Sequence, residues 1–319
     1  MTVDPSRPAA SSTSRQRRSP SSRRSAGASS TSASAGSDAA AGGSRGLGAG
    51  AVRELAARHG IEPSKALGQH FLIDPNLARA IAAEAGARPE DHVVEVGAGL
   101  GSLTLALAAT GALVRAIEFD RALLPALHEV TAGVENVDVV AADATRIDWA
   151  SELKDEPWIL CANLPYNVAV PVVMAVLDDA PTVQRLVILV QREVGERLVA
   201  GPGDEHYGPV SVRVAYRATG ELTRRVPPSV FWPRPKVASV VVRLERLAEP
   251  PVTVEPERLW RVVDAGFAER RKTMRSGVVR LGVDAGRADD LLRGAGIDPR
   301  ARAERLSLQE FARIAEALP

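Results

Sequence analysis

A short apolar run that breaks into alternating glycines constrains this chain more than any other feature. The stretch Val93–Gly101 reads VVEVGAGLG, and apolar residues then recur at helical spacing from Ser102 to Ala109. A β-branched run, a glycine turn and a helix in this order are typical of the edge of a parallel α/β sheet where nucleotide-like ligands bind. The same order also occurs as a packing turn without a ligand, so the turn alone does not establish a site.

The spacing of the glycines narrows the choice of ligand. A dinucleotide fingerprint places its third glycine where this chain has Ser102, and no lysine follows the turn as a P-loop requires. Glu95 precedes the glycines, where a carboxylate repels a pyrophosphate and attracts a positive charge. This pattern favours a ligand that carries a sulfonium and an ammonium group, such as S-adenosylmethionine.

The net charge of +1 hides an uneven distribution along the chain. Residues 1–45 contain seven Arg and two Asp, and residues 220–319 contain 19 basic and 14 acidic residues. The middle of the chain is left with 14 basic and 23 acidic residues. A polyanion held by the basic ends, with a cationic ligand inside the acidic middle, fits this distribution, although purely solvated charged faces would give the same counts.

Cysteine content and hydropathy exclude several classes of protein. The only cysteine is Cys161, so neither an intrachain disulfide nor a cysteine-based metal site can form, and we expect no metal. No apolar run reaches membrane-spanning length, and no signal-peptide core follows the N-terminal arginines. We therefore expect a cytoplasmic protein that does not bind membranes.

Composition and periodicity predict three segments. Residues 1–45 are rich in Ser, Ala, Arg and Gly, which predicts a disordered basic tail, either inert or in loose contact with nucleic acid. Residues 46–250 alternate apolar strands with helices, which predicts a mostly parallel, seven-stranded sheet covered on both faces. Residues 251–319 predict a small all-helical domain.

The predicted strands are Val93–Val96, Leu113–Glu118, Val137–Ala141, Trp158–Cys161, Leu186–Gln191, Glu221–Val226 and Lys236–Leu244. The predicted helices are Gly50–His59, one begun by Asp74 and Pro75, Ser102–Ala109, one from Arg121, one through Pro171–Leu177, Pro209–Tyr216, Pro256–Arg270, Thr273–Leu281, Arg287–Ala295 and Ser307–Leu318. Ser307 and Glu310 have the spacing of a capping box.

Acidic residues follow three successive predicted strands. Glu118 ends the second strand about twenty residues after the glycine turn, where a carboxylate can accept both hydroxyls of a ribose. Asp143 follows the third strand, where it can accept the exocyclic amine of an adenine. Either acid alone could be a helix cap, but together with Glu95 they predict a ligand site at one edge of the sheet.

The segment Asn163-Leu164-Pro165-Tyr166 follows the fourth predicted strand. The exocyclic amine of adenine is a poor nucleophile because its lone pair is delocalised into the ring. The side-chain oxygen of Asn163 and the carbonyl of Leu164 can accept its N–H groups and turn the lone pair toward an incoming methyl group. Pro165 stiffens the turn, and Tyr166 offers a face on which an extruded base can stack. Methyl transfer depends on alignment more than on a strong base, and we expect Cys161 to be a strand residue and not a nucleophile.

Two later segments point to a nucleic acid. Phe231–Lys236 places aromatic faces beside cations, as a site for unstacked bases and phosphates does, although a proline-stiffened packing loop has a similar composition. Glu269–Arg275 is densely basic, and we expect Arg270, Arg271 and Lys272 to contact phosphates.

These motifs, in this order, resemble those of the bacterial small-subunit (16S) rRNA adenine N6,N6-dimethyltransferases. The likeness runs from about Lys65 to Leu318. It is carried by Gly68–Leu72, Glu95–Gly101, Ile117–Asp120, Asp143-Ala144, Asn163–Asn167, Val199–Pro202, Phe231–Val237 and Phe267–Arg275.

The resemblance implies a Rossmann-like α/β fold of the class I S-adenosylmethionine-dependent methyltransferases. It implies dimethylation of N6 of two adjacent adenosines in the 3′-terminal hairpin loop of 16S rRNA, within the 30S particle or its precursor, by a monomer with no metal. The residues it would assign to the cofactor are His70, Leu72, Gly97, Glu118, Asp143 and Asn163. Those it would assign to the target base are Asn163, Leu164, Pro165, Tyr166 and Phe231. Many members of the family have Asn in place of His70.

Two other functions share much of this pattern. One is the related 23S rRNA adenine dimethyltransferase that confers macrolide resistance, against which Val199–Pro202 and Arg270–Arg275 argue. The other is a non-catalytic ribosome assembly or transcription factor on the same scaffold. An intact Asn163–Tyr166 segment and acidic set argue against lost catalysis, because binding alone needs neither.

Overall fold

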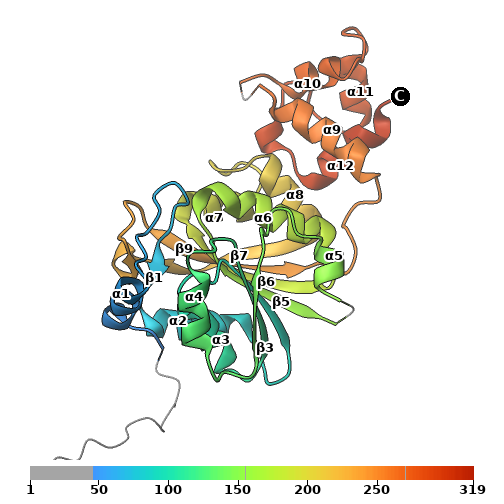
Figure 1. The fold of residues 1–319 in the computed structure, drawn as a ribbon. Coiled ribbons are helices and arrows are strands. Elements are labelled where there is room, and N and C mark those ends of the chain that lie inside the picture. Colours follow the sequence, from blue (N-terminus) through green and yellow to red (C-terminus); the bar gives the residue numbers. More distant parts are fainter. Residues whose placement is uncertain (1–45, 155, 270) are drawn as a thin grey trace, which may run out of the picture. The chain divides into compact units, whose positions relative to one another are not determined.

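Seven strands form the predicted sheet, in the order β4-β3-β2-β5-β6-β9-β7 (Figure 1). The computed structural model describes residues 46–154, 156–269 and 271–319, and Tyr166 by its backbone only. The predicted tail, residues 1–45, therefore lies outside the described residues. The parallel strands are β2 (His92–Val96), β3 (Leu113–Glu118), β4 (Val137–Ala141), β5 (Trp158–Asn163) and β6 (Val183–Gln191).

Two antiparallel strands complete the sheet. β9 (Ser239–Arg246) lies between β6 and β7 (Ala218–Val226) and runs antiparallel to both. This confirms the predicted Rossmann-like α/β fold with a mostly parallel, seven-stranded sheet. β7 is one of the two edge strands of the sheet, and the register of β7 against β9 shifts between Leu222 and Arg224. A bulge and exposed charges on an edge strand oppose pairing with another chain.

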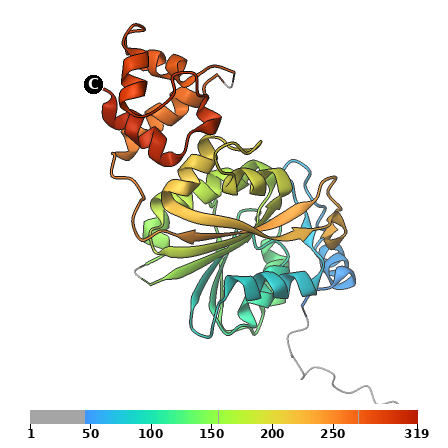
Figure 2. The ribbon, with the colours of Figure 1, turned by 180° about the vertical axis from the view of Figure 1, so that it is seen from behind.

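Helices cover both faces of the sheet, as the near-continuous apolar strands predict (Figures 1 and 2). One face carries α2 (Pro75–Ala85), α3 (Ser102–Ala108) and α4 (Leu124–Thr131). The other carries α5 (Trp149–Glu152), α6 (Tyr166–Asp179), α7 (Arg192–Val199) and α8 (Pro209–Arg217). Successive strand residues alternate between the two cores: Leu160 and Ala162 pack under α6, whereas Cys161 packs under α2 and α3.

A two-stranded ribbon, which the sequence analysis does not predict, joins the start of the domain to a late loop. β1 (Phe71–Leu72) pairs antiparallel with β8 (Phe231–Trp232). The helix α1 (Ala49–Arg58) packs its apolar face against Phe71 and against Leu100 of the glycine turn. The N-terminal segment is therefore part of the wall around that turn.

From residue 256 onward the chain is helical, as predicted, with α9 (Pro256–Phe267), α10 (Met274–Arg280), α11 (Ala288–Gly294) and α12 (Leu308–Ala317). Ser307 and Glu310 form the predicted capping box of α12. The core of these helices continues into α8, because Tyr207, Val212 and Tyr216 belong to the same buried cluster as Phe311. The predicted domain boundary between residues 250 and 251 therefore stays a prediction.

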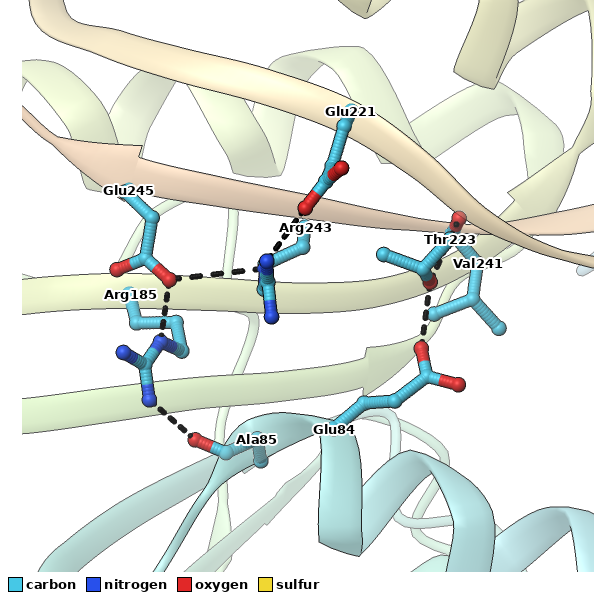
Figure 3. Close-up of polar contacts among 8 residues, drawn as sticks. All are labelled: Glu84, Ala85, Arg185, Glu221, Thr223, Val241, Arg243 and Glu245. Carbon is cyan, nitrogen blue, oxygen red and sulfur yellow. Dashed lines mark hydrogen bonds and ion pairs between the residues drawn. The ribbon is translucent and has the colours of Figure 1, made fainter.

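Charged and polar side chains tie α2 to the antiparallel edge of the sheet (Figure 3). Arg185 of β6 donates to Glu245 of β9 at 2.6 Å and to the carbonyl of Ala85 at the end of α2 at 2.8 Å. Glu84 accepts hydrogen bonds from Thr223 and Arg224 of β7. These contacts fix the antiparallel edge of the sheet against α2, although Glu84 and Thr223 are 139 residues apart in the sequence.

Local signals explain where several helices begin. Asp74 caps α2 by accepting from the N–H groups of Asn76 and Leu77, as expected. α4 begins at Leu124 and not at Arg121, because Pro125 lacks an N–H and occupies the first turn of the helix. No helix in the described part of the chain is long and apolar enough to cross a bilayer.

One arginine secures the end of α6 opposite to Asn163. Arg246 of β9 donates to the carbonyls of Val176, Leu177 and Ala180 at 3.0 Å, and to that of Val183 at 2.6 Å. α6 ends at Asp179, and the residue that follows is Ala180 and not glycine, so the guanidinium satisfies carbonyls that the helix leaves open.

We expect Arg246→Ala to lower the free energy of unfolding by about 3 kcal/mol, since several half-buried carbonyls lose a charged donor. Arg246→Lys should lose about half as much, because an ammonium cannot span the four acceptors. Urea denaturation measures both. The control Arg293→Ala, whose side chain is 62% exposed beside Asp289 and Asp290, should change stability by about 0.5 kcal/mol or less. An equal decrease in the free energy of unfolding for Arg246→Ala and Arg293→Ala would contradict this role of Arg246.

Candidate active site

A cavity of about 350 Å³ lies at the carboxyl ends of β2, β3, β4 and β5. Parallel strands end at the same edge, so residues far apart in sequence meet there. The predicted site residues that line this cavity are His70, Leu72, Gly97, Glu118, Asp143, Asn163, Leu164 and Pro165. Glu95 lines it as well.

The alternating glycines bend the chain tightly over the end of β2. Gly97, Gly99 and Gly101 have φ angles of 76°, 58° and 84°, which residues with a side chain rarely adopt. A Cβ on Gly99 would also lie 3.3 Å from the ring of Phe71. Ser102, where a dinucleotide fingerprint would have glycine, donates instead to the carbonyl of Leu72 at 2.6 Å. The turn is therefore built to hold β1 beside the cavity.

Glu118 holds the glycine turn to the end of β3. Its carboxylate accepts from the N–H of Gly99 at 2.7 Å and from the N–H of Asp120 at 2.8 Å. Burial raises the pKa of Glu118, and the two N–H bonds act against this rise by stabilising the carboxylate. The acid is fixed in position and faces the cavity.

Glu95 lies in β2, two residues before Gly97, and is buried with 1% of its surface exposed. Burial raises the pKa of Glu95 to about 8; the nearby Thr104 hydroxyl opposes this rise, and the charge of Glu118 adds to it. Among the described residues, Glu95 Oε2 finds no hydrogen-bond partner. An unpaired buried carboxyl oxygen is costly unless a ligand supplies a donor or a positive charge.

Asp143 forms a local turn and also lines the cavity. Its Oδ1 accepts from the backbone N–H and the hydroxyl of Thr145, and these bonds lower the pKa of Asp143. Oδ2 lies 3.6 Å from Arg146 Nε, on the exposed side. The acid therefore acts as a turn cap, as the alternative interpretation expects, while remaining ionised at the rim of the cavity.

Asn163 ends β5 between the cavity and the ribbon. Its Nδ2 donates to the carbonyl of His70 at 3.1 Å. Because a carbonyl can only accept, this bond fixes the amide nitrogen and leaves Oδ1 as the free-standing acceptor of the side chain. Leu164 and Pro165 follow directly, and α6 begins at Tyr166, whose side chain lies outside the described part.

A second, smaller cavity of about 30 Å³ adjoins the first. His70, Asn163, Leu164 and Pro165 line both cavities, and Phe231 lines the small one. Phe231 is 4% exposed and packs in a core with Leu72. Its ring is thus beside the predicted target-base residues but mostly covered by neighbouring side chains.

The remaining predicted residues lie elsewhere. Arg271 and Lys272 are exposed in the turn between α9 and α10 and do not line the cavity, and Arg270 lies outside the described residues. Cys161 is buried in β5, and burial raises the pKa of its thiol, as expected of a strand residue that is not a nucleophile. In the described ranges, no group of three His, Cys, Asp or Glu side chains could hold a metal.

The cavity also has residues that the sequence analysis did not single out. Phe119 lines it and is 59% exposed, which is unusual for an aromatic residue directly after a buried acid. Gln69 donates to Asp120 at 2.7 Å and accepts from the N–H of Ser64 at 2.8 Å, so it joins the loop before β1 to the loop after β3. In the sequence, the only indication that Phe119 lines the cavity is its position directly after Glu118.

Known proteins are similar to this chain over most of its length. A family model described as ribosomal RNA adenine dimethylase matches residues 62–319. Ribosomal RNA small subunit methyltransferase A of Thermobifida fusca (strain YX) is 47% identical over 274 residues, 84% of this chain and 94% of that protein. The protein of the same name from Streptomyces coelicolor is 45% identical over 277 residues, 85% of this chain and 96% of that protein.

Solved structures are similar as well. The crystal structure of the 23S rRNA methyltransferase ErmE has a TM-score of 0.62 at 28% identity, covering 78% of this chain and 99% of that one. A dimethyladenosine transferase from Plasmodium falciparum has a TM-score of 0.67 at 23% identity, over 77% of this chain and 96% of that one, which supports the fold. With the family model and relatives above 40% identity, the chain belongs to the ribosomal RNA adenine dimethylase family.

Proposed function

We propose that this protein uses S-adenosylmethionine to dimethylate N6 of two adjacent adenosines in the 3′-terminal hairpin loop of 16S rRNA, in the 30S subunit or its precursor. It would act as a cytoplasmic monomer in small-subunit biogenesis. The observation that carries the proposal is one cavity lined by Glu95, Glu118, Asp143 and Asn163, which lie at or within two residues of the carboxyl ends of four neighbouring strands.

The side chains of the cavity fit the cofactor group by group. Glu95, whose Oε2 is unpaired, offers a buried carboxyl that a bound cationic group would convert to its ionised form. Glu118 would accept from the ribose, Asp143 from the adenine amine, and the exposed ring of Phe119 would cover the base. Gly97, His70 and Leu72 would border the remainder. Bound here, the cofactor supplies a methyl group on a positively charged sulfur.

The residues at the end of β5 would prepare the acceptor. Asn163 Oδ1 and the carbonyl of Leu164 would accept the two N–H groups of N6, which holds the nitrogen lone pair toward the cavity. Tyr166 would stack on the extruded base, and Phe231 would offer a second face from the small cavity that it lines. Pro165 would fix the turn between Leu164 and Tyr166. The proton released from N6 passes to solvent, as no strong base is required for an amine that becomes cationic on alkylation.

The relatives favour the small-subunit substrate over the alternatives. The curated relatives at 42–47% identity are named small subunit methyltransferases, whereas the 23S enzyme ErmE is 28% identical. A non-catalytic assembly factor would not need the unpaired carboxyl of Glu95 or the oriented amide of Asn163. Arg270, Arg271 and Lys272 are the proposed phosphate contacts of the substrate.

The proposed activity is tested by incubating the protein with labelled S-adenosylmethionine and either 30S or 50S subunits that lack the modification. Label should enter the 30S particles and map to N6 of two adjacent adenosines near the 3′ end of 16S rRNA. Label in 23S rRNA would support the resistance-type enzyme, and no label in either particle would overturn the methyltransferase proposal.

Asn163→Ala removes the acceptor proposed for N6. We expect turnover on 30S particles to fall at least about 100-fold, because alignment of the lone pair is lost, while cofactor affinity changes by less than about threefold. Single-turnover rates and calorimetric titration measure the two quantities. Asn76→Ala, which removes an exposed amide on α2, should leave both unchanged. Unaltered turnover in Asn163→Ala would remove this residue from the mechanism.

The double variant Arg271→Ala and Lys272→Ala tests the phosphate contacts. Each lost contact should reduce the slope of log affinity against log salt by about 0.7 to 0.9, so the slope should fall by about 1.5 for the pair. Filter binding to rRNA fragments at several salt concentrations gives the slope. Arg79→Ala with Arg88→Ala removes two exposed cations near α2 and should leave it unchanged. If the Arg271/Lys272 variant and the Arg79/Arg88 variant have the same slope of log affinity against log salt, the phosphate contacts are assigned wrongly.

A further inference from the structure

The ribbon pairs β1, which borders the large cavity proposed for the cofactor, with β8, which borders the small cavity proposed for the target base. Phe71 lies opposite Trp232, and Leu72 lies opposite Phe231. The N–H of Ile73 donates to the carbonyl of Val230 at 2.9 Å, which continues the same register by one residue. In the other direction the register places His70 opposite Pro233.

Beyond the last paired residues of β1 and β8, the side chain of His70 connects the two segments. Pro233 has no backbone N–H to offer a partner. His70 Nδ1 lies 2.6 Å from the carbonyl oxygen of Pro233. A carbonyl can only accept, so Nδ1 carries the proton and donates, which also fixes the tautomer of the neutral ring. The imidazole thus fastens the loop after β8 to the strand before it.

The backbone of the same residue orients the proposed N6 acceptor. The carbonyl of His70 accepts from Asn163 Nδ2 at 3.1 Å. His70 therefore contacts Asn163 through its main chain and Pro233 through its side chain. A shift of the loop that carries Pro233 would be transmitted through one residue to the amide of Asn163.

The two cavities meet at this residue. The large cavity is lined by His70, Leu72 and Asn163, and the small one by His70, Asn163 and Phe231. Leu72 and Phe231 are paired across the ribbon. The spacing between the cofactor cavity and the base-side cavity is therefore set by the ribbon and by the bond at its end.

We propose that His70 is a positioning residue whose Nδ1–H bond to Pro233 holds the 231–235 segment in register with Asn163, so that the target base and the cofactor are aligned. The catalytic part of this inference rests on the proposed function. An asparagine at this position could make the same bond. The Nδ2 of an Asn follows Cβ and Cγ just as Nδ1 of His does, so both side chains can bring an N–H donor to the same carbonyl.

Three variants test whether the role of His70 depends on its hydrogen-bond donor or only on the size of its side chain. His70→Asn keeps a donor, His70→Asp has nearly the same shape but only acceptors, and His70→Ala has neither. A carboxylate facing the carbonyl of Pro233 is repelled, so the Asp variant breaks the connection. If His70 served only to attract the cationic cofactor, Asp would be the best replacement and Ala the worst.

The catalytic readout is kcat/KM for 30S particles at saturating S-adenosylmethionine. We expect His70→Asn to remain within about threefold of the wild type, and His70→Asp and His70→Ala to fall about tenfold or more, mainly through KM for the particle. Calorimetric cofactor affinity should not follow this order. Equal activity of the Asn and Asp variants, or an Asp variant impaired only in cofactor affinity, would overturn the proposal.

A structural readout does not depend on the proposed activity. Hydrogen exchange of peptides covering residues 228–240 should be faster in His70→Asp and His70→Ala than in the wild type, and unchanged in His70→Asn. Peptides from α9 and α12 serve as internal controls and should not change. If the 228–240 peptides exchange at the same rate in the wild type and in all three variants, the positioning role is refuted. If the wild type does not methylate 30S particles, only the proposed function is refuted.

Discussion

Neighbouring parallel strands that end level with one another determine where this chain can carry out chemistry. Val96 at the end of β2 is in register with Ile117 of β3 and Ala162 of β5, and Glu118 is in register with Ala141 of β4. Side chains at these ends meet although the strands are as far apart in the sequence as Val96 and Ala162. The glycine turn after β2 then leaves open the space that these side chains surround.

The electrostatics of that edge depend on which carboxyl group has partners. Glu118 and Glu95 are both buried, and burial raises the pKa of both. Glu118 is compensated by the N–H groups of Gly99 and Asp120, whereas one oxygen of Glu95 is left without a partner among the described residues. On the proposed function a cationic ligand would supply the missing partner, so the unfavourable burial of Glu95 would itself favour the binding of such a ligand.

The sequence predicts the features that depend on local signals. The glycine spacing, the acids at strand ends and the cap at Asp74 each have a cause within a few residues, and the structure contains all of them. The strands of the ribbon are two residues long and about 160 residues apart, so no periodicity marks their pairing. α7 was missed for another reason. Gly195 lowers its helix propensity, yet a Cβ there would lie 2.3 Å from Val240, so the close packing of α7 on β9 requires the glycine.

Proton release on cofactor binding tests the central claim, that the acidic edge of the sheet is a site for a cationic ligand. At pH 7 the carboxyl of Glu95, with a pKa of about 8, is mostly protonated, and a cation beside it favours the ionised form. Calorimetric titration with S-adenosylmethionine at pH 7, in buffers of different ionisation enthalpy, counts the protons released. The wild type should release close to one proton more than Glu95→Gln, and its affinity should rise with pH toward 8. Equal proton release by the two proteins would contradict the account.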